Sequence, residues 1–255
     1  MKSWYGLLVV IGILLAACGR SDAPQGSAPA EPVSDKPVVV QPVPALAQGE
    51  GTIVGEVLFK GAPPVPKRIA INKDKEACGD YKESEELVVG PNRGVKWAVV
   101  SVHIPGGVVQ TKVGSATILD QRGCHFQPHV LLVPAGGMAR ILNPDGVLHN
   151  FHTYSKINPT VNKAQPKFKK EMDVTFEKPE RFRIGCDAHS WMAGWMVVTE
   201  HPFYAVTDEK GSFRLEGIPA GKRVLKIWHE ALRELTAEIE VKAGQTTRVS
   251  FETRQ

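Results

Sequence analysis

The 255-residue sequence is poor in cysteine, in net charge and in long apolar runs. It contains four cysteines, and its 31 Lys and Arg residues stand against 27 Asp and Glu residues, which gives a formal net charge of +4. Such a small charge, without a basic helix or an array of aromatic and basic residues, argues against nucleic-acid binding. The sequence also lacks a paired-carboxylate motif, a Gly-x-Ser-x-Gly turn and a phosphate-binding loop. We therefore expect that the protein is not an enzyme.

The clearest apolar run lies at the N-terminus. Leu7–Leu15 follows Lys2 and leads into small residues and Cys18. The run is too short to span a bilayer as a mature helix, and its layout is typical of an export signal. Residues 1–18 resemble a bacterial lipoprotein signal. The resemblance implies that Cys18 is lipidated and anchors the protein on the periplasmic side of a membrane. Gly19 favours the outer membrane, and an ordinary signal with a chance cysteine is the alternative.

A stretch rich in Ala, Pro, Ser, Gln and Val follows, over residues 19–49. It has few large apolar side chains, so it cannot bury enough surface to fold, and we expect a disordered linker. A Pro-rich tether extends by up to about 3.1 Å per residue. The linker would therefore hold a folded body tens of ångströms from the bilayer.

Short strand-like stretches separated by turn residues fill residues 50–255, without a strong helical period. This pattern is typical of a β-sandwich or barrel, so we expect an all-β fold. The candidate helices are short and comprise Lys73–Cys78 and Glu230–Leu235. The predicted strands are Thr52–Phe59, Trp97–Ile104, His129–Val133, Met138–Leu142, Phe182–Gly185, Trp195–Thr199, Ser212–Leu215, Arg223–Trp228 and Thr246–Phe251.

Four potential metal ligands occur in the middle of the chain. His149 lies upstream, and Cys186, His189 and Met192 follow at a spacing of three residues. Nitrogen and sulfur donors of this kind suit copper. Two His and one Cys in a trigonal plane, with a weak axial Met, form an electron-transfer site. The alternative is that these side chains only pack in a sandwich without metal.

The order of turns, strands and ligands over residues 108–201 resembles the type 1 blue copper proteins, or cupredoxins, and is most similar to amicyanin and plastocyanin. The resemblance implies a Greek-key β-sandwich that binds one type 1 copper through His149, Cys186 and His189, with Met192 as the axial ligand. It also implies a carrier of single electrons, with no open coordination position for a substrate. By similarity to amicyanin, the protein would serve methylamine utilisation, and its partners would be redox proteins such as a periplasmic dehydrogenase or a c-type cytochrome.

The same resemblance assigns roles to residues around the ligands. Asn150 is expected to form hydrogen bonds to the cysteine loop. Asp187 departs from the family pattern, in which Ser or Thr is common after the Cys, and its carboxylate near the thiolate would lower the reduction potential. The short ligand loop should bring the edge of His189 near the surface. The apolar rim expected there, a docking site for a redox partner, comprises Leu148, Trp191 and Trp195. Core packing is the alternative for the tryptophans and is favoured for Trp195.

The cysteines leave several pairings open. If Cys18 is lipidated, Cys78 and Cys124 can form a disulfide, and Cys186 stays free for a metal. Any pairing that includes Cys186 would abolish the copper site. Three further histidines lie near these segments. His125 and His129, close to Cys124, form either a second metal cluster or ordinary hydrogen bonds, and His152 is expected to be structural.

Two segments on either side of the copper module share features of one small domain. Gly51–Val57 is a Gly-rich strand, and Ala205–Leu215 contains a hairpin turn at Asp208–Gly211, with a second turn predicted at Pro219–Gly221. They resemble the two ends of a carboxypeptidase regulatory-like domain, a small transthyretin-like β-sandwich.

The cupredoxin module would then be inserted in, or packed on, a sandwich formed by residues 50–107 and 202–255. The alternative is two consecutive domains, with residues 50–107 adding strands to the copper domain. Two other functions stay open at this point: a copper-delivery lipoprotein without a redox role, and a structural or carbohydrate-binding surface module.

Overall fold

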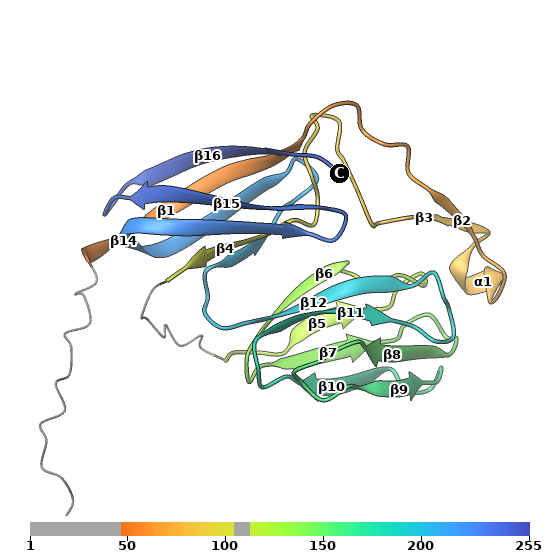
Figure 1. Cartoon of the computed structure of the whole chain (residues 1–255). Coiled ribbons are helices and arrows are strands. Elements are labelled where there is room, and N and C mark those ends of the chain that lie inside the picture. Colours follow the sequence, from red (N-terminus) through yellow and green to blue (C-terminus); the bar gives the residue numbers. More distant parts are fainter. Residues whose placement is uncertain (1–46, 105–112) are drawn as a thin grey trace, which may run out of the picture. The chain divides into compact units, whose positions relative to one another are not determined.

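The computed structural model describes residues 47–104 and 113–255 (Figure 1). The predicted signal, Cys18 and nearly all of the predicted linker lie outside the described residues, as does the predicted boundary between residues 107 and 108. Within the described part of the chain, no helix has the length and apolar character needed to cross a membrane. Strands dominate, and one short helix accompanies them, so the all-β prediction is confirmed.

One sheet contains strands from both ends of the described chain. Its order is β13-β4-β14-β1-β16, and β15 also pairs with β14. Its strands are β1 (Ala47–Phe59), β4 (Val99–His103), β13 (Tyr204–Val206), β14 (Ser212–His229), β15 (Leu232–Val241) and β16 (Thr246–Thr253). β14 is long enough to pair with β1 through its first half and with β4 and β15 through its second half. The two segments that resemble one sandwich therefore share a sheet, and their transthyretin-like character stays a prediction.

The middle of the chain forms two further sheets, with orders β10-β7-β5 and β6-β12-β11-β8-β9. Parallel pairing of β5 with β7 and of β6 with β12 shows that the chain crosses between the sheets. Buried side chains from both sheets form one apolar core, including Leu119, Ile141, Phe151, Phe182 and Met196. The strands are β5 (Thr117–Asp120), β6 (Val130–Pro134), β7 (Met138–Leu142), β8 (His149–Thr153), β9 (Asn162–Gln165), β10 (Glu171–Thr175), β11 (Glu180–Gly185) and β12 (Ala193–Thr199).

An arm over residues 60–86 leaves the first sheet between β1 and β4. It carries β2 (Arg68–Ala70), α1 (Lys75–Cys78) and β3 (Tyr81–Glu83), and β2 pairs with β3. A disulfide between Cys78 and Cys124 ties the arm to the middle sheets, with a Cα–Cα distance of 5.2 Å. Ile71 and Cys78 are buried in the same core as the residues of those sheets. The arm is therefore packed against the body that contains the metal-binding candidates.

Two local predictions are wrong. Glu230–Leu235 is not a helix, because the chain turns after His229 and Leu232 begins β15, which pairs with β14. Pro219–Gly221 is not a turn but lies within β14, where the strand changes partner from β1 to β15. The guanidinium of Arg223 donates hydrogen bonds to three carbonyls there, at 2.7–2.8 Å, and satisfies backbone acceptors at this irregular point.

Candidate metal centre

Neighbouring strands bring the three strong donor residues together. His149 is the first residue of β8, Cys186 follows the end of β11, and His189 lies in the loop between β11 and β12. β8 and β11 are paired, which places the two donor segments side by side. The loop is closed by backbone bonds from the Cys186 amide to the Met192 carbonyl at 3.3 Å and from the Met192 amide to the His189 carbonyl at 3.0 Å.

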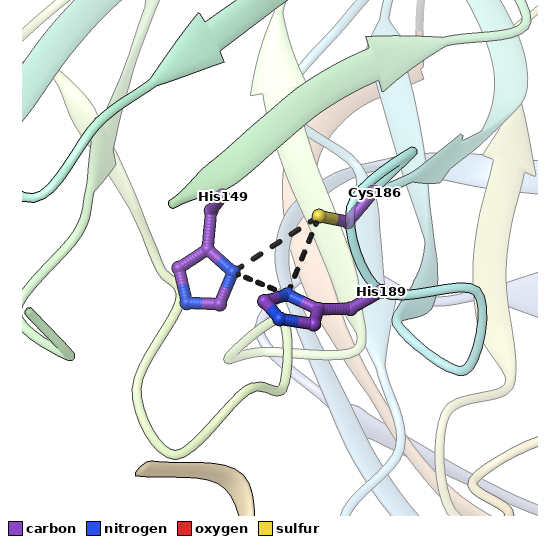
Figure 2. Close-up of side chains that lie close together, drawn as sticks. All are labelled: His149, Cys186 and His189. Atoms are coloured by element: carbon purple, nitrogen blue, oxygen red, sulfur yellow. Dashed lines mark hydrogen bonds between the residues drawn. The ribbon is translucent and has the colours of Figure 1, made fainter. Parts of the chain in front are cut away.

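The donor atoms converge on one point (Figure 2). The Nδ1 atoms of His149 and His189 are 3.1 Å apart, and the Cys186 Sγ lies 4.0 Å and 3.8 Å from them, respectively. An ion bound at about 2.0 Å to nitrogen and about 2.3 Å to sulfur, at trigonal angles, sets donor separations of roughly 3.5 and 3.7 Å. The observed triangle is within half an ångström of that arrangement, so these residues fit a single trigonal cation.

Each imidazole is oriented by a carboxylate on its far side. The Nε2 atom of His149 lies 2.9 Å from Asp145 Oδ2, and the Nε2 atom of His189 lies 2.9 Å from Asp74 Oδ2. Because a carboxylate accepts, both Nε2 atoms carry the hydrogen and both Nδ1 atoms present lone pairs. Two facing lone pairs repel at this distance, and a cation between them turns the repulsion into two bonds. The Nε2-protonated tautomers of His149 and His189 therefore favour metal binding.

Burial sets the protonation of the donors. It raises the pKa of the Cys186 thiol and lowers the pKa of His149, in spite of the hydrogen bond from His149 to Asp145. A neutral imidazole is the ligand form, and a metal ion displaces the thiol proton on binding. The backbone amide of Asn150 lies 3.2 Å from the sulfur and stabilises the resulting thiolate. A bound metal ion would thus meet a neutral His149 imidazole and the Cys186 thiolate.

Cys186 is a free, buried cysteine. A second group of close donor atoms comprises Cys124, Asp145 and His149. The Cys124 sulfur belongs to the disulfide with Cys78, so it has no thiolate to offer a metal. The group with Cys186 is therefore the one that presents a complete set of soft and borderline donors.

The residues around the donors form a hydrogen-bonded frame. The Asn150 side-chain oxygen accepts from the Asp187 amide at 3.2 Å, which links the His149 and Cys186 segments. Asp187 itself faces His152 Nδ1 at 2.9 Å, and this hydrogen bond lowers the pKa of the Asp187 carboxyl. Met192 is buried in the same core as Cys186, and its axial role stays a prediction.

The edge of His189, expected near the surface, lies directly beneath Asp74 and Trp191, which are partly exposed. Its side chain is fully buried, as is that of His149, because Asp74 on the arm and the ring of Trp191, 4.9 Å away, cover it. Leu148 is 45% exposed, and Trp191 is half-buried. Trp195 packs against Trp228 and donates to Glu230 instead, in a different apolar cluster. The predicted rim therefore does not form as one patch around His189.

The second histidine cluster makes hydrogen bonds rather than a donor triangle. His125 Nδ1 lies 3.2 Å from Glu85 Oε2, and His129 Nε2 forms a short contact to Glu230. Among the described residues, the groups of donors close enough to share an ion include neither of these histidines. The hydrogen-bonding alternative for His125 and His129 is thus the one found, and His152 likewise bonds to Asp187.

Asp74 and Asp145 were missed by the sequence reasoning. Asp145 had a local signal, since it lies in a turn four residues before His149. Asp74 is 115 residues from His189 in sequence, and only the folding of the arm brings them together.

No family model matches the chain, and no curated protein matches it in sequence. Among solved structures, its neighbours are amicyanin and cupredoxin-like proteins. A methionine mutant of amicyanin in the Cu(I) form is 19% identical, with 39% of this chain matched to 99% of that protein at a TM-score of 0.31. A purple cupredoxin from Nitrosopumilus maritimus is 18% identical, over 32% of this chain and 99% of that protein, at 0.28. A copper-containing nitrite reductase from Thermus scotoductus is 21% identical, over 40% and 26%, at 0.31.

Proposed function

We propose that this chain is a mononuclear type 1 copper protein that carries single electrons between redox partners. One observation carries the proposal: two buried Nδ1 lone pairs and one buried sulfur face a common point, at separations of 3.1–4.0 Å. A thiolate and two imidazoles in this arrangement are the donors of an electron-transfer copper site.

His149, Cys186 and His189 would hold the copper, and Met192 would supply the weak axial sulfur. The bound ion would supply one-electron exchange between Cu(I) and Cu(II). The chain supplies a frame that changes little between these states, because its donors lie on paired strands and on a loop closed by backbone bonds. Burial of both imidazoles keeps water from the donors. With no open coordination position in this ligand set, we propose a carrier rather than an enzyme.

The cellular setting is part of the proposal. Lipidation at Cys18 would anchor the protein on the periplasmic side of a bacterial membrane, with the outer membrane favoured. The Cys78–Cys124 disulfide supports an exported location, since such bonds persist in oxidising compartments. The partners would be redox proteins such as a periplasmic dehydrogenase or a c-type cytochrome. Their docking would be transient and small, near Leu148 and Trp191.

The test uses the full chain, purified in detergent, beside a Cys186→Ser variant. After addition of Cu(II), the wild-type protein should bind one copper per chain and show an intense visible band from the Cu(II)–thiolate bond. The variant should lack that band. Stoichiometric but colourless Cu(I) would point to a copper-delivery protein instead. Equal colour in both proteins, or none in either with no copper bound, would contradict the proposal.

A further inference from the structure

We infer that Asp74 and Asp145 are positioning residues of the copper centre, one carboxylate on each ligand imidazole, and that together they favour Cu(II) over Cu(I). This inference rests on the proposed function. Both Nε2–carboxylate distances are 2.9 Å, and the two histidines have no exposed surface. The Cys78–Cys124 disulfide joins the short helix that follows Asp74 to the backbone whose amides bind Asp145, so the arm contributes to the metal site.

The side chain of Asp74 does not cap the helix that it precedes. It is the N-cap residue of α1, where an Asp side chain normally accepts from the first backbone amides of the helix. Here it makes no such side-chain bond, and its backbone is left-handed, with φ 51° and ψ 39°. Only its backbone carbonyl serves the helix, accepting from the Cys78 amide at 2.9 Å. The carboxylate is directed at His189 instead.

Asp145 is held by backbone donors as well as by its histidine. Its Oδ1 accepts from the Gly123 amide at 2.7 Å, and its Oδ2 accepts from the Cys124 amide at 2.8 Å. Both donor residues have positive φ, 62° and 57°, a conformation that lets successive amides point at one anion. The Asp145 side chain is only 7% exposed. The position of its carboxylate is therefore set by these backbone amides independently of His149.

The disulfide connects the two arrangements. Cys78 is the last residue of the helical turn that begins after Asp74, and Cys124 supplies one of the amides that hold Asp145. The bond between Cys78 and Cys124 thus sets the positions of both carboxylates relative to the two imidazoles. Each carboxylate accepts a hydrogen bond from its own ring.

The electrostatic effect has a definite sign. A carboxylate that accepts the far N–H of a ligand imidazole fixes the ring orientation and raises the basicity of the ligating nitrogen. Two such carboxylates, with the thiolate, place negative charge around one buried cation. The doubly charged Cu(II) gains more from that charge than the singly charged Cu(I), since the interaction scales with the charge of the ion. The reduction potential is therefore lowered.

The experiment compares Asp74→Asn and Asp145→Asn with Asp80→Asn in the full chain. Asn tolerates the left-handed backbone and keeps a side-chain oxygen to accept from His189, so the first variant removes charge alone. Asp80 lies in the same arm and is exposed, with a surface ion pair to Lys75. Cu(II) affinity, reduction potential and visible spectrum are measured at one pH.

Each of the first two variants should bind Cu(II) about 10- to 100-fold more weakly while keeping the visible band. Every tenfold loss specific to Cu(II) raises the potential by about 59 mV. The Asp80 variant should match wild type. Potentials equal to that control in a coloured protein would overturn the inference and leave the proposed function standing. A wild-type protein without coloured copper would instead defeat the proposed function. If Asp145→Asn fails to fold, as judged by circular dichroism, Asp74→Asn decides alone.

Discussion

Two histidine pairs in the middle of the chain have similar surroundings and opposite arrangements. His149 and His189 lie beside two Asp carboxylates, and His125 and His129 lie beside Glu85 and Glu230. In the first pair the carboxylates take the far nitrogens, and the near nitrogens face a sulfur. In the second pair Glu85 stands between the rings, 3.2 Å and 3.9 Å from their Nδ1 atoms. The same residue types therefore present converging donor atoms only where the carboxylates turn both rings toward the Cys186 sulfur.

The largest expected difference between the two histidine pairs is in copper binding. Replacing His149 by Ala removes one of three strong donors, so the protein should lose stoichiometric copper and its visible band. Replacing His129 by Ala should leave one copper per chain and the same band, because His129 contacts Glu85 and Glu230 and does not belong to the donor triangle. Metal content after gel filtration and the visible spectrum decide. Loss of copper from the His129 variant alone would reverse the comparison.

Copper should also stabilise the fold. At a free copper concentration 1,000-fold above the dissociation constant, binding adds about 4.1 kcal/mol to the free energy of unfolding. Urea unfolding with and without copper should show this increment in wild type and in His129→Ala, and a smaller one in Cys186→Ser, which keeps both imidazoles but loses the thiolate. An equal increment in Cys186→Ser would show that the copper binds elsewhere.

Removal of the disulfide tests the link between arm and site. The double variant Cys78→Ala, Cys124→Ala should lose about 2–5 kcal/mol of unfolding free energy. Its Cu(II) affinity should fall by at least as much as that of Asp74→Asn, because both carboxylates lose their anchor. Isothermal titration and urea unfolding measure the two effects. Wild-type copper affinity in a folded double variant would show that the disulfide does not position the carboxylates.

The second pair predicts a smaller effect that is independent of copper. Glu230 accepts from Trp195 Nε1 at 2.8 Å and contacts His129, which is buried. Glu230→Ala should lower the unfolding free energy by about 1–3 kcal/mol, since His129 Nε2 and Trp195 Nε1 lose their partner. The visible spectrum and the potential should stay at wild-type values. A shifted potential would mean that the two pairs are coupled.

The smallest effect concerns pH. Burial lowers the pKa values of His201 and His229, which lie outside both pairs. The unfolded chain then binds more protons than the folded one below about pH 6.5. Above that pH both histidines are neutral in the folded and the unfolded chain, and the copper-free protein keeps its full free energy of unfolding. As the pH falls further, that free energy decreases. Urea unfolding at several pH values should show a flatter decline for His229→Gln, and an unchanged slope would contradict the assignment.

Local sequence patterns were sufficient for the parts of the fold with clear alternation. β1 and β12 combine β-branched and aromatic residues with flanking turns and were predicted. β15 was mistaken for a helix at its start, because the segment Glu230-Ala231-Leu232-Arg233 contains good helix formers. Pairing with β14 overrides that propensity. Residues of β9 are largely exposed, so no apolar pattern revealed that strand.

The candidate metal site also has features that the sequence predicts and features that it does not. The spacing of Cys186, His189 and Met192 on one loop is visible in the sequence itself. The pairing of β8 with β11, which brings His149 to Cys186, joins segments that are distant in sequence, and β8 was not among the predicted strands. The burial of His189 and the role of Asp74 depend on an arm that joins the site from far away in sequence. A contact of that range leaves no periodicity or spacing for sequence reasoning to detect.

X-ray absorption spectroscopy at the copper edge distinguishes a sulfur-bound copper from one held by nitrogen and oxygen. For the Cu(II)-loaded wild-type chain we expect a shell of one short sulfur bond and two imidazole nitrogens, with the sulfur absent in Cys186→Ser. A shell of nitrogen and oxygen alone in the wild-type protein would contradict the proposed type 1 copper site.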